Sequence, residues 1–188
     1  MNVWINLDEL HPEVRADIVP VIDDIVALDE LSRDSYEDVR IEVAANGYTL
    51  AETLEILSDD KSRYVRYCVA GNNNTSFDTL RKLSHDREKT VRLAVAENPN
   101  TPPDALIHLA YDRCDRIREA LIYNENSPRE IFYILSKDKS TRIRLLLAEW
   151  CHTPAPVLMA LSADKRFVVR DEARTTLESA PLEEADEL

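Results

Sequence analysis

One pattern returns six times along this chain at a fixed spacing of 26 residues. Each occurrence has a leucine at its first position, an aspartate at its fourth, and a Val-Arg or Ile-Arg pair at its ninth and tenth. The leucines are Leu31, Leu57, Leu83, Leu109, Leu135 and Leu161. No insertion or deletion breaks the register. A fixed period between about 20 and 50 residues is typical of stacked repeat proteins, so the period constrains the fold more than any other feature.

The residue composition favours an all-α chain. Hydrophobic residues make up 44% of the sequence, enough for a packed core, and only two glycines occur, so turns that need a positive φ angle are scarce. Leucine, alanine, glutamate, arginine and aspartate are abundant. The chain contains no apolar run of about 18 residues, and we therefore expect no membrane span. The first residues lack the basic start and apolar core of a secretory signal.

The third repeat shows how one unit is expected to fold. A helix is predicted from about Glu88 to Asn98, because apolar side chains recur there at helical spacing. It should end at Asn98, since asparagine tolerates a left-handed cap and a proline follows. A second helix is predicted with Thr101 as its N-cap and Pro102 at its first position, ending near Ala110.

The same end signals recur in the other repeats. Asparagine occupies the predicted stop of the first helix at Asn46, Asn72, Asn98 and Asn124. A hydroxyl residue occupies the predicted N-cap of the second helix at Thr49, Thr75, Thr101, Ser127 and Thr153. We interpret the asparagines as helix caps and not as ligands of a bound group.

The chain is expected to form one repeat domain over residues 1–188. Residues 1–30 hold a weak extra unit, marked by Ile5 and Asp8, which we interpret as an acidic N-terminal cap. Six repeats follow over 31–179, and 180–188 form an acidic tail. In the last repeat, Arg174 and Thr176 replace the usual small and asparagine residues, as a polar terminal unit requires. Net charge is −13 overall, and residues 1–56 carry 14 acidic against 3 basic side chains.

The repeat resembles the leucine-rich repeat variant family of bacteria. The third repeat, TVRLAVAENPNTPPDALIHLA, matches the family pattern best, and the resemblance extends over about residues 31–179. It implies a right-handed α-solenoid of about six 26-residue helical repeats. Some family members carry a cysteine-rich iron–sulfur segment, but this chain has no such cluster, so we expect no cofactor. The Asp-x(5)-Arg spacing is also similar to that of the HEAT repeat, in which these residues form a ladder along the inner helices.

The repeated arginines admit two interpretations. They could form an anion-binding stripe, but each follows an aspartate by six residues, and one-to-one pairing would neutralise that stripe. We therefore favour a structural ladder in which guanidinium groups bridge carboxylates and loop carbonyls between repeats. The ladder residues are Asp60, Arg66, Asp86, Arg92, Asp112, Arg118, Asp138 and Arg144.

No arrangement of residues in the sequence indicates catalysis or metal binding. The four histidines occupy different repeat positions, and no Ser–His–Asp set, paired-carboxylate motif or CxxC can be assembled. Trp150, Cys151 and His152 stand together, but no third metal ligand follows at a suitable spacing, and we interpret Trp150 as a packed residue. The three cysteines are odd in number and widely separated, which favours a reducing compartment such as the cytoplasm.

Partner recognition is predicted on the outward side of the first helices, at the eighth, eleventh and fifteenth repeat positions. Tyrosine and arginine, which are common at binding hot spots, are frequent there. The candidate partner-binding residues are Tyr64, Tyr67, Leu93, Arg116, Tyr123 and Arg142. In the alternative interpretation, Ile41, Tyr67, Leu93 and Leu145 belong to the core between repeats.

These features predict a non-catalytic protein–protein interaction scaffold, expected to be a cytoplasmic monomer, that holds a protein or peptide on a concave helical face. Nucleic-acid binding or alkylated-base repair is one alternative, because some HEAT-like solenoids are glycosylases. That function needs a basic groove, whereas residues 57–160 carry only 16 basic against 14 acidic side chains. A third possibility is that the acidic N-terminal region docks on a basic partner or mimics nucleic acid.

Overall fold

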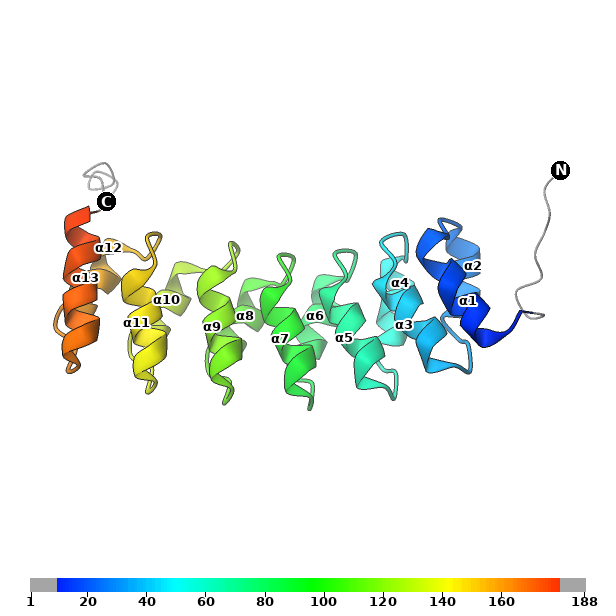
Figure 1. Ribbon diagram of the computed structural model, residues 1–188, viewed down its shortest axis with the longest axis horizontal. Coiled ribbons are helices and arrows are strands. Elements are labelled where there is room, and N and C mark those ends of the chain that lie inside the picture. Colours follow the sequence, from blue (N-terminus) through cyan, green and yellow to red (C-terminus); the bar gives the residue numbers. More distant parts are fainter. Residues whose placement is uncertain (1–9, 180–188) are drawn as a thin grey trace. The chain divides into compact units, whose positions relative to one another are not determined.

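The computed structural model describes residues 10–179, so the predictions for Ile5, Asp8 and the acidic tail fall outside the described residues. Within them the chain forms α-helices and one short 3-10 helix, with no strand, which confirms the predicted all-α class (Figure 1). None of these helices is both long and apolar enough to cross a bilayer.

Each of the first five repeats contains a nine-residue first helix and a seven-residue second helix, and the described part of the sixth contains one longer first helix. The first helices are α3 (Glu37–Ala45), α5 (Arg63–Gly71), α7 (Lys89–Glu97), α9 (Asp115–Tyr123), α11 (Thr141–Glu149) and the longer α13 (Phe167–Ser179). The second helices are α4 (Ala51–Leu57), α6 (Phe77–Leu83), α8 (Pro103–Leu109), α10 (Arg129–Leu135) and α12 (Ala155–Leu161). The second helices are therefore α-helical, which the sequence pattern does not decide.

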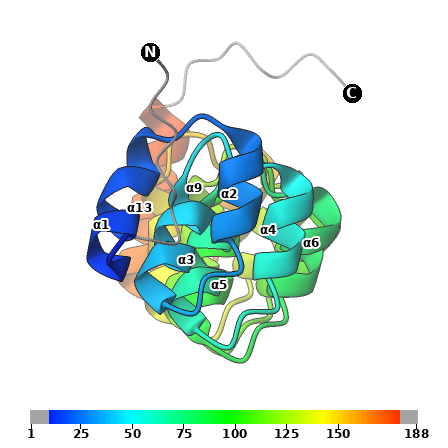
Figure 2. The ribbon, with the colours of Figure 1, turned by 90° about the vertical axis from the view of Figure 1, so that its right-hand side faces the viewer.

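The chain divides into two compact units, the first ending at Ala105 and the second beginning at Leu106. Unit 1 begins with α1 (Pro12–Ile18), the 3-10 helix η2 (Val19–Val21) and α2 (Ile25–Leu31). In unit 1, α5 packs against α3 and α7, and each second helix packs against the first helices beside it. Figure 2 shows this layering in unit 1, with α2, α4 and α6 on one side and α1, α3 and α5 on the other. In unit 2, α11 packs against α9 and α13, with α10 and α12 beside them.

The core of each unit is made by the apolar repeat positions. In unit 1, Val65 and Val69 of α5 lie one helical turn apart and are fully buried, as is Leu80 of α6. Val91 in unit 1 and Ile117 in unit 2, both at the ninth repeat position, are also fully buried. Neighbouring repeats thus cover the apolar side that an isolated helix pair would leave in water.

The asparagines end the first helices at the predicted position, but the predicted left-handed conformation is wrong. Asn72 is the C-cap of α5 with φ −76° and ψ 130°, an extended conformation. Its Nδ2 donates to the backbone oxygens of Ala44 and Asn46 in the preceding repeat, both at 2.9 Å. Its Oδ1 accepts from Asn74 N at 2.9 Å. The side chain therefore turns the chain and joins two repeats from an extended backbone conformation.

The predicted N-cap role of the threonines is also wrong. The N-cap of α6 is Ser76, whose Oγ accepts from Thr79 N at 3.2 Å. Thr75 instead donates its hydroxyl to Val69 O at 2.5 Å, back in the first helix of its own repeat. Thr49, Thr101 and Ser127 form the equivalent bond with the residue six positions earlier. The threonines therefore fix the loop to the helix that precedes it. α8 likewise begins at Pro103, one residue later than predicted.

The last repeat replaces the asparagine without losing the contact between repeats. Thr176 Oγ1 donates to Ala148 O at 2.6 Å, and these residues are 28 positions apart, like Asn72 and Ala44. A threonine within a helix does not stop it, and α13 runs 13 residues to Ser179. Arg174, where earlier repeats have a small residue, is exposed.

Candidate functional site

In unit 1 the repeated arginines pair with the aspartate of the following repeat. Arg66 Nε and Nη2 donate to Asp86 Oδ2 and Oδ1 at 2.7 and 3.1 Å. Arg40 binds Asp60 in the same bidentate way, at 2.6 and 3.1 Å. The remaining nitrogen, Arg66 Nη1, donates to Asp60 O at 2.8 Å, within its own repeat. We call these contacts the Asp–Arg ladder. Each guanidinium group joins two repeats and is buried while doing so.

Unit 2 has the same arrangement. Arg118 pairs with Asp138 at 2.6 and 3.0 Å, and Arg144 pairs with Asp164 at 2.7 and 3.2 Å. Arg118 Nη2 also contacts Asp115 Oδ1 at 2.7 Å, within α9.

The two other predicted ladder residues lie one in each unit. In unit 1, Arg92 Nη1 donates to Asp86 O at 2.7 Å. In unit 2, Asp112 O accepts from Arg118 Nη1 at 2.6 Å, and Asp112 Oδ1 accepts from Cys114 N at 2.8 Å.

One ladder member was not predicted from the sequence. Arg15 Nε and Nη2 donate to Asp34 Oδ2 and Oδ1 at 2.7 and 3.2 Å. The two partners are 19 residues apart in sequence here and 20 in the other pairs, so Arg15 lies one residue out of the repeat register. A long arginine side chain accommodates a shift of one residue, and the irregular first unit therefore still joins the ladder.

Ladder contacts lower the pKa of Asp60, Asp86 and Asp164 and so favour their charged form. Burial by itself raises the pKa of Asp60, but hydrogen bonds from Arg40 and from the Ser62 N–H lower it below its ordinary value overall. The hydrogen bond from Arg144 is the main reason why the pKa of Asp164 is lowered. Since both partners are charged and matched one to one, the buried arginines have no spare charge for an external anion.

The first-helix face, defined by the eighth, eleventh and fifteenth repeat positions, exposes aromatic side chains in unit 1. Tyr64 and Tyr67 of α5 are 52% and 46% exposed. Ile41 of α3 and Leu93 of α7 occupy the same repeat position as Tyr67 and are partly exposed. Because α5 packs against both helices, these residues form an apolar row across three neighbours. Tyr67 is therefore not part of the core between repeats.

Tyr64 is held by the residue before it. The Arg63 guanidinium lies over the Tyr64 ring at 4.8 Å from its centroid, and Arg63 Nη2 donates to Tyr64 Oη at 2.8 Å. A cation placed over an aromatic face at this distance is attracted to it. The ring is thereby oriented in advance, which lowers the entropic cost of using it in a contact.

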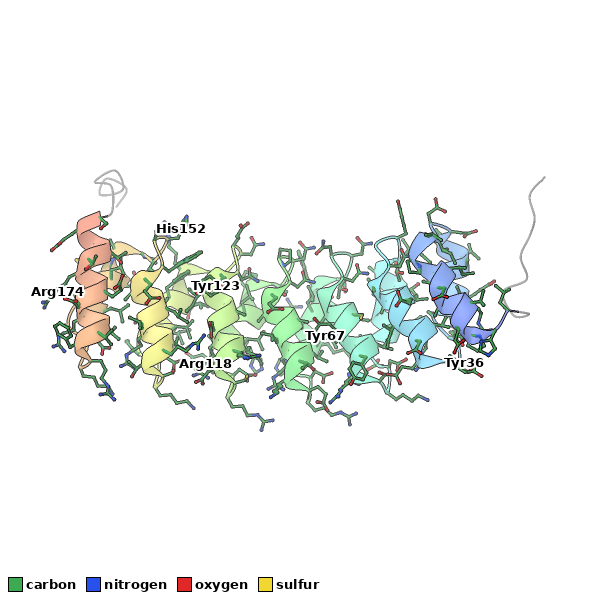
Figure 3. All side chains as sticks on the ribbon, in the orientation of Figure 1. Tyr36, Tyr67, Arg118, Tyr123, His152 and Arg174 are labelled. Carbon is green, nitrogen blue, oxygen red and sulfur yellow. The ribbon has the colours of Figure 1, made fainter. Side chains whose placement is uncertain are left out.

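The three candidate residues in unit 2 have different surroundings. Arg142 pairs with Glu119 at 2.9 Å, whereas the exposed Arg116 forms no ion pair among the described residues. Tyr123 is 46% exposed and packs edge to face on Trp150, with ring centroids 4.9 Å apart. Arg118 and Tyr123 lie toward opposite ends of α9 (Figure 3), so the aromatic contact is separate from the ladder.

The Trp150 region is an aromatic cluster that sequence spacing does not reveal. The His152 ring lies 5.3 Å from the Trp150 ring, and Cys151 Sγ lies 3.2 Å from His152 Nδ1. Trp150 takes the asparagine position in this repeat. The Thr153 hydroxyl nearby is the one fully buried side-chain polar group of the described residues that has no hydrogen bond. Between residues 10 and 179, no three His, Cys, Asp or Glu side chains are placed to hold a metal ion.

A family model and one solved structure indicate the same repeat type. The family model described as "Leucine rich repeat variant" matches residues 90–113. A solved structure titled "A leucine-rich repeat variant with a novel repetitive protein structural motif" is 27% identical, covers 96% of this chain and 74% of its own, and gives a TM-score of 0.68. The search of curated proteins found no match.

Two designed armadillo repeat proteins are also similar, though more distantly. One, YIII(Dq)4CqI, is 16% identical, covers 93% of this chain and 97% of its own, and has a TM-score of 0.36. The other, YIII(Dq.V1)4CPAF in complex with the peptide (KR)4, is 17% identical, covers 93% and 89%, and has a TM-score of 0.34. The strong match is therefore the repeat variant, and the predicted repeat type, the leucine-rich repeat variant, is confirmed.

Proposed function

We propose that this chain is a non-catalytic scaffold that holds a protein or peptide partner on its first-helix face, in the cytoplasm. One observation carries the proposal: Tyr64 and Tyr67 are about half exposed and continue into Ile41 and Leu93 on the adjacent helices. Exposed tyrosines beside apolar side chains are characteristic of binding hot spots, where they provide large contact areas with few rotatable bonds.

The contrast between the buried and the exposed positions of the repeat supports this proposal. The ladder arginines, the asparagines and the threonines are buried and used in contacts within the protein. The residues at the eighth and fifteenth positions, in contrast, are exposed in every repeat and vary in type along the chain, although Arg116 and Arg142 share the eighth position in two neighbouring repeats. The repeat thus keeps its stabilising residues fixed and leaves its outward side free to vary, as a recognition surface requires.

The test is recovery of a partner with the full chain as bait, followed by affinity measurement with the purified pair. We expect Tyr67→Ala to weaken binding by roughly tenfold or more, as loss of a hot-spot tyrosine does. Tyr48→Ala is the matched control, because Tyr48 is 62% exposed but lies in the loop before α4. If Tyr67→Ala and Tyr48→Ala bind the partner as tightly as the wild type, the first-helix face is not the binding surface.

A further inference from the structure

A groove with a volume of about 720 Å³ lies in unit 2, among the loop before α9, the helix α10 and the loop after it. Sites that hold small ligands or short segments have volumes of about 300–1,000 Å³. Two aromatic side chains line it, Tyr111 at 72% and Tyr133 at 46% exposure, with Ile134 beside them. None of the candidate residues on the first-helix face lines this groove. It is therefore a separate surface from the one in the proposed function.

The free charge in the groove is positive. Arg118 and Asp138 also line it, but they neutralise one another in the Asp–Arg ladder. Arg113, Lys137 and Lys139 are exposed, and their side chains form no ion pair or hydrogen bond with any described residue.

Glu130 opposes these cations as the one free carboxylate of the described groove lining. Asp112 lines the groove as well, with its Oδ1 accepting from Cys114 N at 2.8 Å, so the lining as a whole carries four basic and three acidic side chains. The exposed side chains among them are three cations and one anion, and this excess favours an acidic occupant, because a complementary potential attracts it and orients it.

Unit 1 provides an internal comparison at the same repeat positions. The corresponding residues lie 52 positions earlier in the sequence: Asp59 corresponds to Tyr111, Arg81 to Tyr133, and Lys82 to Ile134. There Lys82 Nζ pairs with Asp59 Oδ1 at 2.6 Å, and Arg81 pairs with Asp78 and Asp104, each at 2.5 Å. The charges at these positions of unit 1 are thus matched within the chain.

In unit 2 the paired charges are replaced by aromatic and aliphatic side chains, and the flanking cations have no partner among the described residues. Repeat geometry does not require this change, since the same backbone positions in unit 1 accept ion pairs. Exposed tyrosines surrounded by unpaired cations leave both kinds of group available to a ligand.

We propose that this groove binds an acidic peptide segment that carries an apolar side chain, with the apolar group between Tyr111 and Tyr133 and the carboxylates on Arg113, Lys137 and Lys139. A single-stranded nucleic acid would also offer stacking and negative charge. It is less well matched, because a long polyanion also meets the net charge of −13 on the chain. A short acidic peptide interacts mainly with the local groove charge.

The experiment uses the purified full chain and three fluorescein-labelled probes. The first is the peptide Glu-Glu-Leu-Phe-Glu-Glu, the second is its counterpart with lysine in place of glutamate, and the third is a single-stranded oligothymidine. Fluorescence anisotropy should show saturable binding of the acidic peptide at about 50 mM salt and binding weakened by roughly tenfold at about 300 mM salt. The lysine peptide should not bind.

Two variants test whether the acidic peptide binds in the groove. Lys137→Glu combined with Lys139→Glu should weaken acidic-peptide binding by roughly tenfold or more. The triple variant Tyr111→Asp, Tyr133→Arg, Ile134→Lys copies the ion-paired version of unit 1 and removes the apolar contacts, so it should weaken binding by roughly tenfold or more with an unchanged helical circular dichroism spectrum. The control is Lys61→Glu, which should bind the peptide as the wild type does. Lys61 is exposed and occupies the same repeat position as Lys139, but it does not line the groove.

Three results would overturn the proposal. The first is no binding of the acidic peptide, the second is binding of the lysine peptide as tight as that of the acidic one, and the third is full affinity of a folded triple variant for the acidic peptide. Preferential binding of the oligothymidine, lost in that triple variant, would assign the groove to nucleic acid instead. Since Tyr67→Ala leaves the groove intact, a failure here is distinguishable from a failure of the first-helix face.

Discussion

At the scale of single residues, hydrogen bonding decides what each repeated polar side chain does. Thr75 and Thr153 occupy the same repeat position and are both buried. The Thr75 hydroxyl donates to Val69 O at 2.5 Å, whereas the Thr153 hydroxyl has no partner within the described residues. A buried hydroxyl stabilises a fold only when its hydrogen bond is made, because its contact with water has been lost.

This difference predicts opposite effects of one substitution. Thr75→Val removes the hydroxyl bond to Val69 O, which keeps its bond from Asn72 N at 3.2 Å, so it should lower the free energy of unfolding by about 0.5–1.5 kcal/mol. Thr153→Val replaces an unpaired buried hydroxyl by a methyl group, so it should leave the stability unchanged or raise it by up to about 1 kcal/mol. Urea unfolding followed by circular dichroism measures both variants. Equal losses in the two would mean that the hydroxyl bond is energetically unimportant.

At the scale of helices, both ends of a first helix are tied to a neighbouring repeat. In unit 1 the N-terminal side of α5 is tied by the bond of Arg66 to Asp86 in the next repeat. The C-terminal end is tied by Asn72, whose Nδ2 reaches Ala44 in the preceding repeat. A nine-residue helix is too short to be stable alone, so these ties and the packing against its neighbours maintain it.

Loss of one ladder carboxylate should therefore destabilise the stack. Asp86→Ala leaves the buried Arg66 guanidinium without its bidentate partner, and breaking a buried ion pair in this way costs about 3–5 kcal/mol. The matched control is Arg87→Ala, because Arg87 is exposed and adjacent in sequence, and its loss should change stability by less than about 0.5 kcal/mol. Thermal unfolding of the two variants is the measurement. If Asp86→Ala melts like the wild type, the ladder does not stabilise the array.

At the scale of the whole molecule, the ladder makes stability depend on pH. The pKa values of Asp60, Asp86 and Asp164 are all lowered in the folded protein. A carboxyl group whose pKa is lower when folded adds stability above its unfolded pKa of about 3.9 and loses it as the pH falls through the folded value. These three aspartates belong to three different repeats, so their contacts with Arg40, Arg66 and Arg144 are lost together on acidification.

We therefore expect the melting temperature to be nearly constant between about pH 7 and pH 5 and to decrease below about pH 4. Asp164→Asn should melt lower than the wild type at neutral pH, and the difference should shrink below about pH 4, because the wild-type carboxyl is then protonated as well. Scanning calorimetry across this range gives both curves. A difference that stays constant down to about pH 2 would show that the charge of Asp164 is not what stabilises the protein.

Repeat length, the all-α class and most helix positions followed from the sequence alone. A 26-residue period without insertions brings the same residue types to the same place in every repeat, and buried Val91 and Ile117 agree with that register. Pairing of repeated aspartates with repeated arginines was also foreseeable, because their numbers match one to one. Such features depend on local spacing, which a sequence records directly.

Tertiary structure alone decided which repeat each polar group contacts. Arg66 binds an aspartate 20 residues away, and Asn72 donates to a carbonyl 28 residues away. The packing of the helices also determines that Tyr67 is half exposed and that a groove lies beside Tyr111. The physical reason is that hydrogen bonds and exposure depend on distances between segments remote in sequence, and these distances are set only when the helices pack.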